Sequence, residues 1–456
     1  MNSFAILNSF DRLCIPFVGL LSPTAPLPQS VHAVNSPLSL HSQDHPVTTR
    51  KLPWSSWIAS RKRQVAFWIL IIVGGVLLTH LIDGHLAQES EGSFGIIRSG
   101  AWGDLKESNI RIEQPQEYAG FEKTNEEGPF WSFGSLSTQA VHDLLINSGC
   151  TGEQTTKLLA KRMEGMGAIV ILKPDIEIVL NLSPEVRSKL YLQLARNPAN
   201  RFQATPYFIP NGDVGKFFEN HHSSDEKAKG LMKRLLYQRN GFSYFSDPES
   251  IIRGLDSDKE RVDFLRSLTS QDAVLAQLLI RPDSDIDKPL NYWALSMQGV
   301  LLKDLKPLLE SQKKLPHGGS VSLLYALPPM ARDRLYTSPL PPKDGDPKLP
   351  DCHWTALNFF NLTPDPRMSD NDFAGRLITD HYYEIAQPGI AGDLVLLLNS
   401  SGAVVHSAVY LADDLVFTKN GINYAQPWIL MHERDLVGTF SAISPVKVGY
   451  FRRRDM

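Results

Sequence analysis

Apolar and polar residues are distributed in different ways along the chain and divide it into unlike segments. Residues 65–82 (VAFWILIIVGGVLLTHLI) carry no charge and are apolar on every side, a pattern typical of a helix that spans a bilayer. Between residue 131 and about residue 280, apolar residues recur at helical spacing. From residue 381 onward, short alternating or continuous apolar runs lie between turn-like segments, which predicts strands.

The helical pattern of the middle segment begins behind recognisable N-terminal caps. Thr151 and Gln154 have the spacing of a capping box, and Ser183 followed by Pro184 is a favourable helix start. The helical spacing continues through DKERVDFLRSLTSQDAVLAQLLI, which ends at residue 280. We therefore interpret residues 131–330 as a mainly helical domain.

The residues on either side of the apolar segment lack the pattern of a folded core. Residues 1–64 are rich in Ser and Pro, which predicts a mostly disordered tail. Residues 83–130 are rich in Gly and Glu with little periodicity, which favours a linker or stalk. A buried core helix and a cleaved signal peptide are alternative interpretations of the apolar segment. However, it is apolar all round and begins some 60 residues into the chain.

The charges around the apolar segment predict its orientation. Arg61, Lys62 and Arg63 precede it directly, whereas no Lys or Arg occurs after it until Arg98. Because cytoplasmic flanks carry the excess of Lys and Arg, residues 1–64 are expected in the cytoplasm. The rest of the chain is then expected outside the cytoplasm, in the periplasm, anchored by a single span of the cell membrane.

Composition excludes several classes of protein. The mean hydropathy of −0.18 excludes a polytopic membrane protein. The net charge of −3 provides no overall basic field, so nucleic-acid binding is not expected. Three cysteines are too few for a disulfide scaffold or a four-cysteine zinc site, and we expect neither a metal nor a cofactor.

The last part of the chain, residues 331–456, is predicted to be an α+β domain with an antiparallel sheet. A Pro-rich connector, YTSPLPPKDGDPKLP, precedes one or two short helices. About six strands follow. The strand candidates are HYYEIA (381–386), GDLVLLLN (392–399), AVVHSAVYLA (403–412), LVFTKN (415–420), VGTFSAI (437–443) and VKVGYFRR (446–453).

A cysteine and a histidine in this part are candidates for catalysis. Cys352 follows Asp351, a good N-cap, so its thiol is predicted in the first turn of a helix, where free amides favour the thiolate. His406 lies within an apolar strand pattern. A cysteine at a helix start and a histidine on a later strand fit Cys–His nucleophilic catalysis. Taken one at a time, each residue fits a packing role in the core better than a catalytic one.

The neighbouring strand offers groups that would orient the histidine ring. If Leu411 pairs with Leu415 across the turn, His406 falls opposite Asn420. Side chains on one strand face recur every second residue, so Thr418 and Asn420 share the face of His406. Asn420 ranks first as the orienting residue and Thr418 second, with His432 as a further candidate.

Three motifs occur in an order that resembles a known family. They are Asp351-Cys352 at a helix start, GDLV at residues 392–395, and a histidine that leads into VYLADDLVF. This order resembles that of the NlpC-type papain-like cell-wall cysteine peptidases and covers roughly residues 331–456. The family often has a tyrosine upstream near the thiol, and Tyr336 is the candidate here.

The sequence also departs from the family pattern. His353-Trp354-Thr355 follows the cysteine where the family has Ser-Gly-Phe or a similar triplet. Thr418 stands where the family commonly has its second histidine. The departures leave the third catalytic residue open.

The resemblance implies hydrolysis of an amide bond, usually in the peptide stems of peptidoglycan. Cys352 would be the nucleophile and His406 the base, with Tyr336 assisting the oxyanion. Two alternatives remain: a catalytically inactive module that binds cell wall or a partner, and a papain-like acyltransferase. Because a disulfide with Cys150 would consume the nucleophile, both cysteines are predicted to be unpaired.

Overall fold

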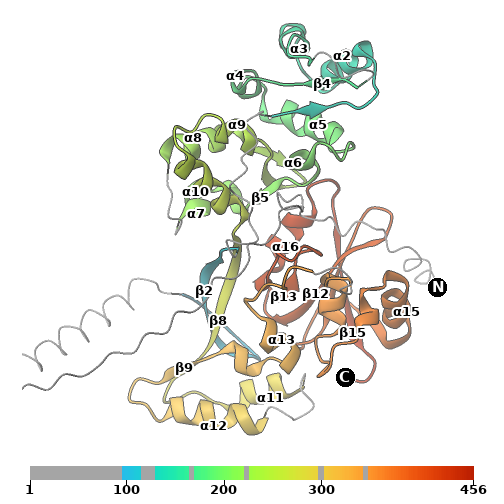
Figure 1. The fold of residues 1–456 in the computed structure, drawn as a ribbon. Helices are drawn as coiled ribbons and strands as arrows, with labels where there is room; N and C mark the ends of the chain where they lie inside the picture. The colour runs from blue at the N-terminus through green and yellow to red at the C-terminus, as the bar shows by residue number, and fades with distance from the viewer. Residues whose placement is uncertain (1–94, 115–128, 164–168, 220–224, 296–301, 343–347) are drawn as a thin grey trace, which may run out of the picture. The chain divides into compact units, whose positions relative to one another are not determined.

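The computed structural model describes residues 95–114, 129–163, 169–219, 225–295, 302–342 and 348–456 (Figure 1). From Ile96 on, these residues belong to one compact unit. The described part is an α+β structure whose sheets are antiparallel. The predicted tail and the predicted span at residues 65–82 lie outside the described residues. Within the described ranges, no helix has both the length and the apolar character needed to cross a bilayer.

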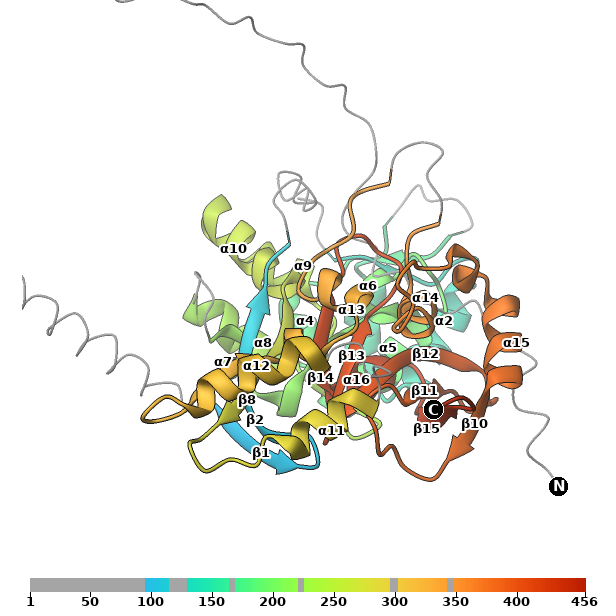
Figure 2. The same ribbon diagram turned by 90° about the horizontal axis from the view of Figure 1, so that it is seen from below.

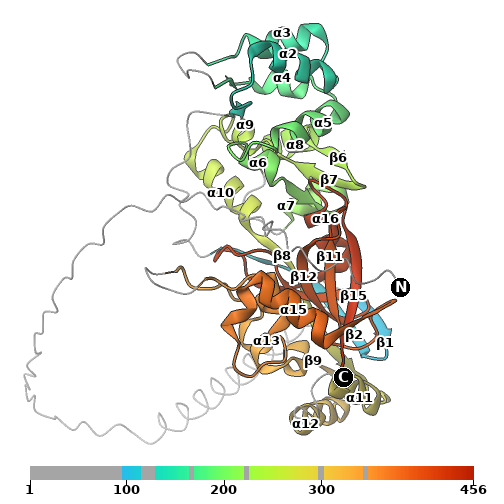
Figure 3. The same cartoon turned by 90° about the vertical axis from the view of Figure 1, so that its right-hand side faces the viewer.

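Short helices around a three-stranded sheet form the part of the chain from residue 131 to residue 269 (Figure 3). Both predicted caps are present: Thr151 and Gln154 form a capping box, and the side chain of Ser183 caps the helix that begins at Pro184. The helices are α2 (Thr138–Asn147), α3 (Gly152–Leu159), α4 (Ile176–Leu180), α5 (Pro184–Leu194), α6 (Arg201–Ala204), α7 (Val214–Phe218), α8 (Glu226–Leu235), α9 (Pro248–Ile252) and α10 (Asp258–Thr269). The sheet has the order β5 (Tyr207–Ile209), β7 (Phe242–Phe245), β6 (Tyr237–Arg239), and β3 (Trp131–Ser132) pairs with β4 (Ile171–Leu172).

A four-stranded sheet corrects two of the sequence predictions. Its order is β1 (Ile96–Gly100), β2 (Gly103–Ile112), β8 (Gln271–Ile280), β9 (Gly319–Ser322). The segment 83–130 is therefore not all linker, because it contributes a hairpin whose apolar signal is diluted by the buried, ion-paired Glu107. The helical pattern also ends earlier than predicted, since α10 stops at Thr269 and β8 follows. A short continuous apolar run cannot be told from a helix by spacing alone.

A six-stranded sheet forms the C-terminal part, as the sequence predicts, with one exchange of elements. Its order is β10 (Tyr382–Ile385), β15 (Lys447–Arg453), β11 (Leu394–Leu398), β12 (Val404–Ala412), β13 (Leu415–Lys419), β14 (Trp428–His432). The predicted strand at 437–443 is instead mostly helix α16 (Glu433–Phe440), and β14 was not predicted. The remaining helices are α11 (Asp287–Leu295), α12 (Leu302–Lys313), α13 (Pro329–Arg334), α14 (Cys352–Leu357) and α15 (Asn371–His381).

The apolar cores do not divide the chain at residue 330, the predicted end of the helical domain. One apolar cluster joins β8, α11 and α12 to α14 and to one face of the six-stranded sheet. A separate cluster holds the helical part from Trp131 to Leu268. Strand β8 and the helices after it thus share a core with the C-terminal domain, because the apolar face of β8 needs the C-terminal residues to cover it.

The aspartate of the GDLV motif fixes the start of β11. Asp393 is fully buried and accepts a two-pronged contact from Arg452 on β15, at 2.7 Å for each pair of atoms. It also accepts hydrogen bonds from the backbone amides of Gly389 and Ile390. A buried carboxylate held by four donors is a strong structural contact, so this motif residue has a scaffold role.

Candidate active site

Cys352 lies where the sequence places it, at the first residue of α14. The Asp351 carboxylate caps this helix by accepting a hydrogen bond from the Trp354 amide at 2.8 Å. The apolar residues of α14 pack on the face of the sheet that carries Val409 and Phe417. The thiol is therefore at the amide-rich end of a helix, but Cys352 is completely shielded from solvent.

The predicted orienting residues lie beside the His406 ring. Tyr410 pairs with Val416, as the sequence predicts, although a bulge moves the partner of Leu415 from Leu411 to Ala412. His406 Nε2 lies 2.8 Å from Thr418 Oγ1, which lies 3.3 Å from Asn420 Oδ1. Thr418, ranked second from the sequence, makes the direct contact, and Asn420 acts one step behind it.

This chain of contacts favours one tautomer of the ring. With the Thr418 hydrogen directed at the Asn420 carbonyl oxygen, the hydroxyl accepts a hydrogen bond from His406 Nε2–H. A neutral ring with its hydrogen on Nε2 carries a lone pair on Nδ1. The arrangement orients His406 with its basic nitrogen away from Thr418.

The basic nitrogen of His406 has no hydrogen-bond partner among the described residues. The ring is completely buried and stacks on Phe440 of α16, with ring centroids 4.0 Å apart. Burial lowers the pKa of His406 well below its ordinary value, and the nearby His353 lowers it further. The ring is therefore neutral near pH 7, with a basic nitrogen that makes no hydrogen bond to another polar group of the described residues.

A second histidine holds the start of α14 against β12. His353 follows Cys352, and its Nδ1 lies 2.7 Å from the hydroxyl of Ser407, the residue after His406 (Figure 2 shows α14 beside β12). The contact therefore joins the two chain segments one residue from each catalytic candidate. Neighbouring side chains of a strand point to opposite faces, so the His406 ring lies on the other side of β12, with Thr418 and Phe440.

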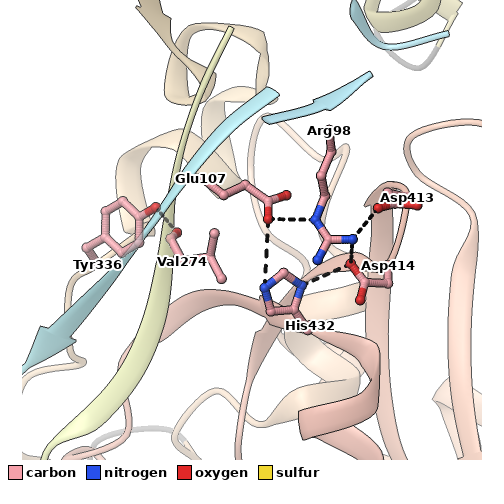
Figure 4. Close-up of polar contacts among 7 residues, drawn as sticks. All are labelled: Arg98, Glu107, Val274, Tyr336, Asp413, Asp414 and His432. Carbon is pink, nitrogen blue, oxygen red and sulfur yellow. Dashed lines mark hydrogen bonds and ion pairs between the residues drawn. The ribbon is translucent and has the colours of Figure 1, made fainter. Parts of the chain in front are cut away.

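Tyr336 does not offer its hydroxyl to an oxyanion in this structure. The hydroxyl donates to the backbone carbonyl of Val274 on β8 at 2.6 Å (Figure 4). A tyrosine hydroxyl has one hydrogen, and this bond occupies it. The upstream tyrosine thus links the connector before α14 to the four-stranded sheet.

His432, the further candidate, belongs to a charged network instead. Its Nδ1 lies 2.9 Å from Asp414 and its Nε2 lies 3.8 Å from the buried Glu107, which also pairs with Arg98 (Figure 4). Arg98 in turn contacts Asp413 in the turn between β12 and β13. The network ties the hairpin of β1 and β2 to the six-stranded sheet.

This network makes stability depend on pH. The hydrogen bond to Asp414 is the main cause that raises the pKa of His432, and Glu107 contributes. A raised pKa means that the folded state holds the proton more tightly. Its stabilising effect is therefore full below the unfolded pKa of about 6.5 and is lost as pH rises through the folded pKa. From pH 6 to pH 8 we expect the network to lose on the order of 1 kcal/mol.

The measurement is the unfolding free energy in urea at both pH values. In His432→Gln the decrease between pH 6 and pH 8 should be smaller than in the wild type, whereas the exposed His317→Gln should retain it. An unchanged decrease in His432→Gln would contradict this role.

The sequence did not single out His353 or Phe440 as parts of this site. His353 had a signal, because a histidine directly after the cysteine interrupts an otherwise apolar helix start. Phe440 had none, since its segment carries a strand pattern and only the packing of α16 brings its ring over His406. Cys150 and Cys352, both in the described part, form no disulfide bond.

Comparison of the sequence with protein-family models, with curated proteins and with solved structures finds no match. Function must therefore be argued from the site itself.

Proposed function

We propose that the C-terminal part is a papain-like cysteine hydrolase that cleaves an amide bond. The observation that carries this proposal is the state of His406: a neutral ring that contacts Thr418 through Nε2 and whose Nδ1 has no partner among the described residues. A general base needs this combination of a fixed orientation and a free lone pair. The place of Cys352 in the first turn of α14 supports it as the nucleophile.

The proposed reaction proceeds in two balanced steps. In this structure the His406 ring and α14 lie on opposite faces of β12, so the reaction requires a rearrangement that brings the ring to the thiol. His406 Nδ1 then takes the thiol hydrogen of Cys352, and the sulfur bonds to the substrate carbonyl carbon while the Cys352 amide stabilises the oxyanion. The imidazolium then gives this hydrogen to the leaving amine as the carbon–nitrogen bond breaks, which leaves a thioester. Water, deprotonated by the same nitrogen, attacks the thioester, releases the acid and restores the thiol.

A second function is favoured by one observation, the complete burial of the site. Cys352, His406 and Thr418 all have no exposed surface, and the ring of His406 lies on the face of β12 away from Ser407. A protein that retains the fold as a binding module needs no access to these residues. Under this alternative, Cys352 and His406 pack the core and the module binds cell wall or a partner.

Thiol alkylation separates the two functions. Full-length protein is treated with iodoacetamide at pH 6, and the alkylation of each cysteine is followed by mass spectrometry of its peptide. Cys150 is an internal control, because burial raises the pKa of its thiol to about 11. The hydrolase should alkylate at Cys352 faster than at Cys150, and His406→Ala should slow Cys352 by roughly tenfold or more. Equal, slow alkylation of Cys352 in both proteins would instead support the binding module.

We further propose that residues 65–82 anchor the protein in the cell membrane with the C-terminal part in the periplasm. The support is the uncharged apolar run and the Arg61–Arg63 cluster before it. Facing the cell wall, the enzyme would meet peptidoglycan stem peptides. Protease treatment of spheroplasts should then degrade the C-terminal part while an epitope at residue 1 survives; the reverse pattern would refute the topology.

A further inference from the structure

A cavity of about 150 Å³ lies between the helical part and the six-stranded sheet. Its floor comes from β8 and β14, and its sides come from α16 and from the segment around β5 and α7 (Figure 3 shows α16 beside the three-stranded sheet). The contact across it is direct, because Tyr244 on β7 donates to the backbone carbonyl of Gly438 on α16 at 2.6 Å. The cavity is thus part of the packed unit.

The cavity adjoins the candidate base. Phe440, whose ring covers His406, is one of its lining residues. Asn420, which accepts the hydrogen bond from Thr418, is another. A group in this cavity is therefore separated from the His406 ring by a single side chain, and a rotation of Phe440 would join the two.

The walls of the cavity are mostly apolar. They include three aromatic rings and two aliphatic side chains that face a small volume: Phe208, Phe217, Phe440, Ile429 and Met431. A cavity of this size with apolar walls holds a group as large as benzene, and it offers few hydrogen bonds to a polar group. The fitting occupant is therefore a single aromatic or branched apolar group.

Two carboxylates line the same cavity, and they differ in their ion pairs. Asp272 pairs with Arg111 at 3.0 Å. The Asp435 side chain makes neither a hydrogen bond nor an ion pair in the part of the chain that the structure describes, and the only charges that act on it are those of nearby residues such as His432. Its partial burial strengthens the attraction to a cation placed in the cavity. The apolar walls and this carboxylate together favour an apolar group that bears a neighbouring ammonium.

We propose that this cavity binds the amino-terminal residue of a peptide, with its apolar side chain against Phe208 and Phe440 and its α-ammonium at Asp435. The assignment of the bound peptide as substrate rests on the proposed hydrolase. The substrate class is then a peptide with a free amino terminus and an aromatic or branched first residue. The binding itself does not require the thiol.

The test measures binding by isothermal titration calorimetry to full-length Cys352→Ser, which cannot complete hydrolysis. Phenylalaninamide carries both features, N-acetylphenylalaninamide lacks the ammonium, and alaninamide lacks the large side chain. We expect phenylalaninamide to bind, with each of the other two roughly tenfold or more weaker. Equal affinity of the three amides, or no binding of phenylalaninamide, would overturn the proposal.

A charge variant locates the site. Asp435→Asn keeps the shape of the side chain and should lower the affinity for phenylalaninamide by roughly tenfold. The affinity for N-acetylphenylalaninamide should not change. The exposed Asp372→Asn is the matched control and should change neither. An unaltered phenylalaninamide affinity in Asp435→Asn would place the ligand elsewhere. A result in which the three amides bind with the expected order of affinities while Cys352 is alkylated slowly would support the cavity as a binding site and contradict the proposed hydrolase.

Discussion

Replacing His406 by glutamine is expected to lower the rate of amide hydrolysis by about 100- to 10 000-fold. The change removes the only group that, in the proposed reaction, takes the thiol hydrogen and returns it to the leaving amine. Glutamine still reaches the Thr418 hydroxyl, which His406 Nε2 contacts at 2.8 Å, so the strand pairing is retained. The measurement is the release of fluorescent coumarin from phenylalanine coumarin amide by full-length protein, with Cys352→Ser as the inactive reference.

Two variants of the orienting residue distinguish a base from a packing histidine. Thr418→Ser keeps the hydroxyl that accepts from Nε2–H and should retain most activity, whereas Thr418→Val removes it. The valine variant should lose part of the rate without losing substrate affinity, because only the ring orientation changes. If His406→Gln hydrolyses the amide as fast as the wild type, His406 is not the base.

Replacing Arg187 by methionine is expected to destabilise the helical part by about 3–5 kcal/mol. Arg187 is 1% exposed, and its guanidinium donates to backbone carbonyls of two separate segments. These carbonyls belong to Val179, Leu182, Arg234 and Leu236. Because the acceptors are backbone groups, they remain buried and lose their donor when the side chain becomes apolar.

Urea unfolding followed by far-UV circular dichroism measures this loss. Arg196→Met, on an exposed position just after α5, is the matched control and should change the unfolding free energy by less than about 0.5 kcal/mol. Similar stability of the two variants would mean that the four carbonyls find other partners.

Local signals predicted the helix starts well, because a cap acts within one turn. The Thr151–Gln154 capping box and the Ser183 cap depend only on residues up to three positions apart. The Asp351 cap before Cys352 is of the same kind. Local signals did not predict elements whose choice between helix and strand depends on distant residues. Strand β8 is an example, because its apolar run suits either a helix or a buried strand.

The prediction of a strand at residues 437–443 was wrong for a related reason. Its alternating residues predict a strand, but β14 already completes the edge of the sheet beside β13. The chain turns into α16 instead and covers the sheet, with Leu436 buried beneath it. Whether a short apolar run forms a strand or a helix that packs on the sheet depends on whether a sheet edge is free to pair with it.

The candidate site was predicted in part by the same logic. The pairing of Tyr410 with Val416 follows from a short turn, and it places Thr418 and Asn420 on the face of His406. The roles of these two residues within the chain of hydrogen bonds depend on side-chain rotamers, which strand periodicity does not specify. The contact of Tyr336 with Val274 joins residues 62 positions apart and has no local signal.

The sequence by itself determined the α+β character of the C-terminal part, the pairing of Tyr410 with Val416, and the place of Cys352 at a helix start. Each of these follows from residues that are neighbours in the chain. Only the tertiary structure decided that Phe440 covers His406, that Nδ1 has no partner among the described residues, and that a cavity lies beside them. These features arise where segments distant in sequence pack together, and the free energy of that packing is spread over the whole core.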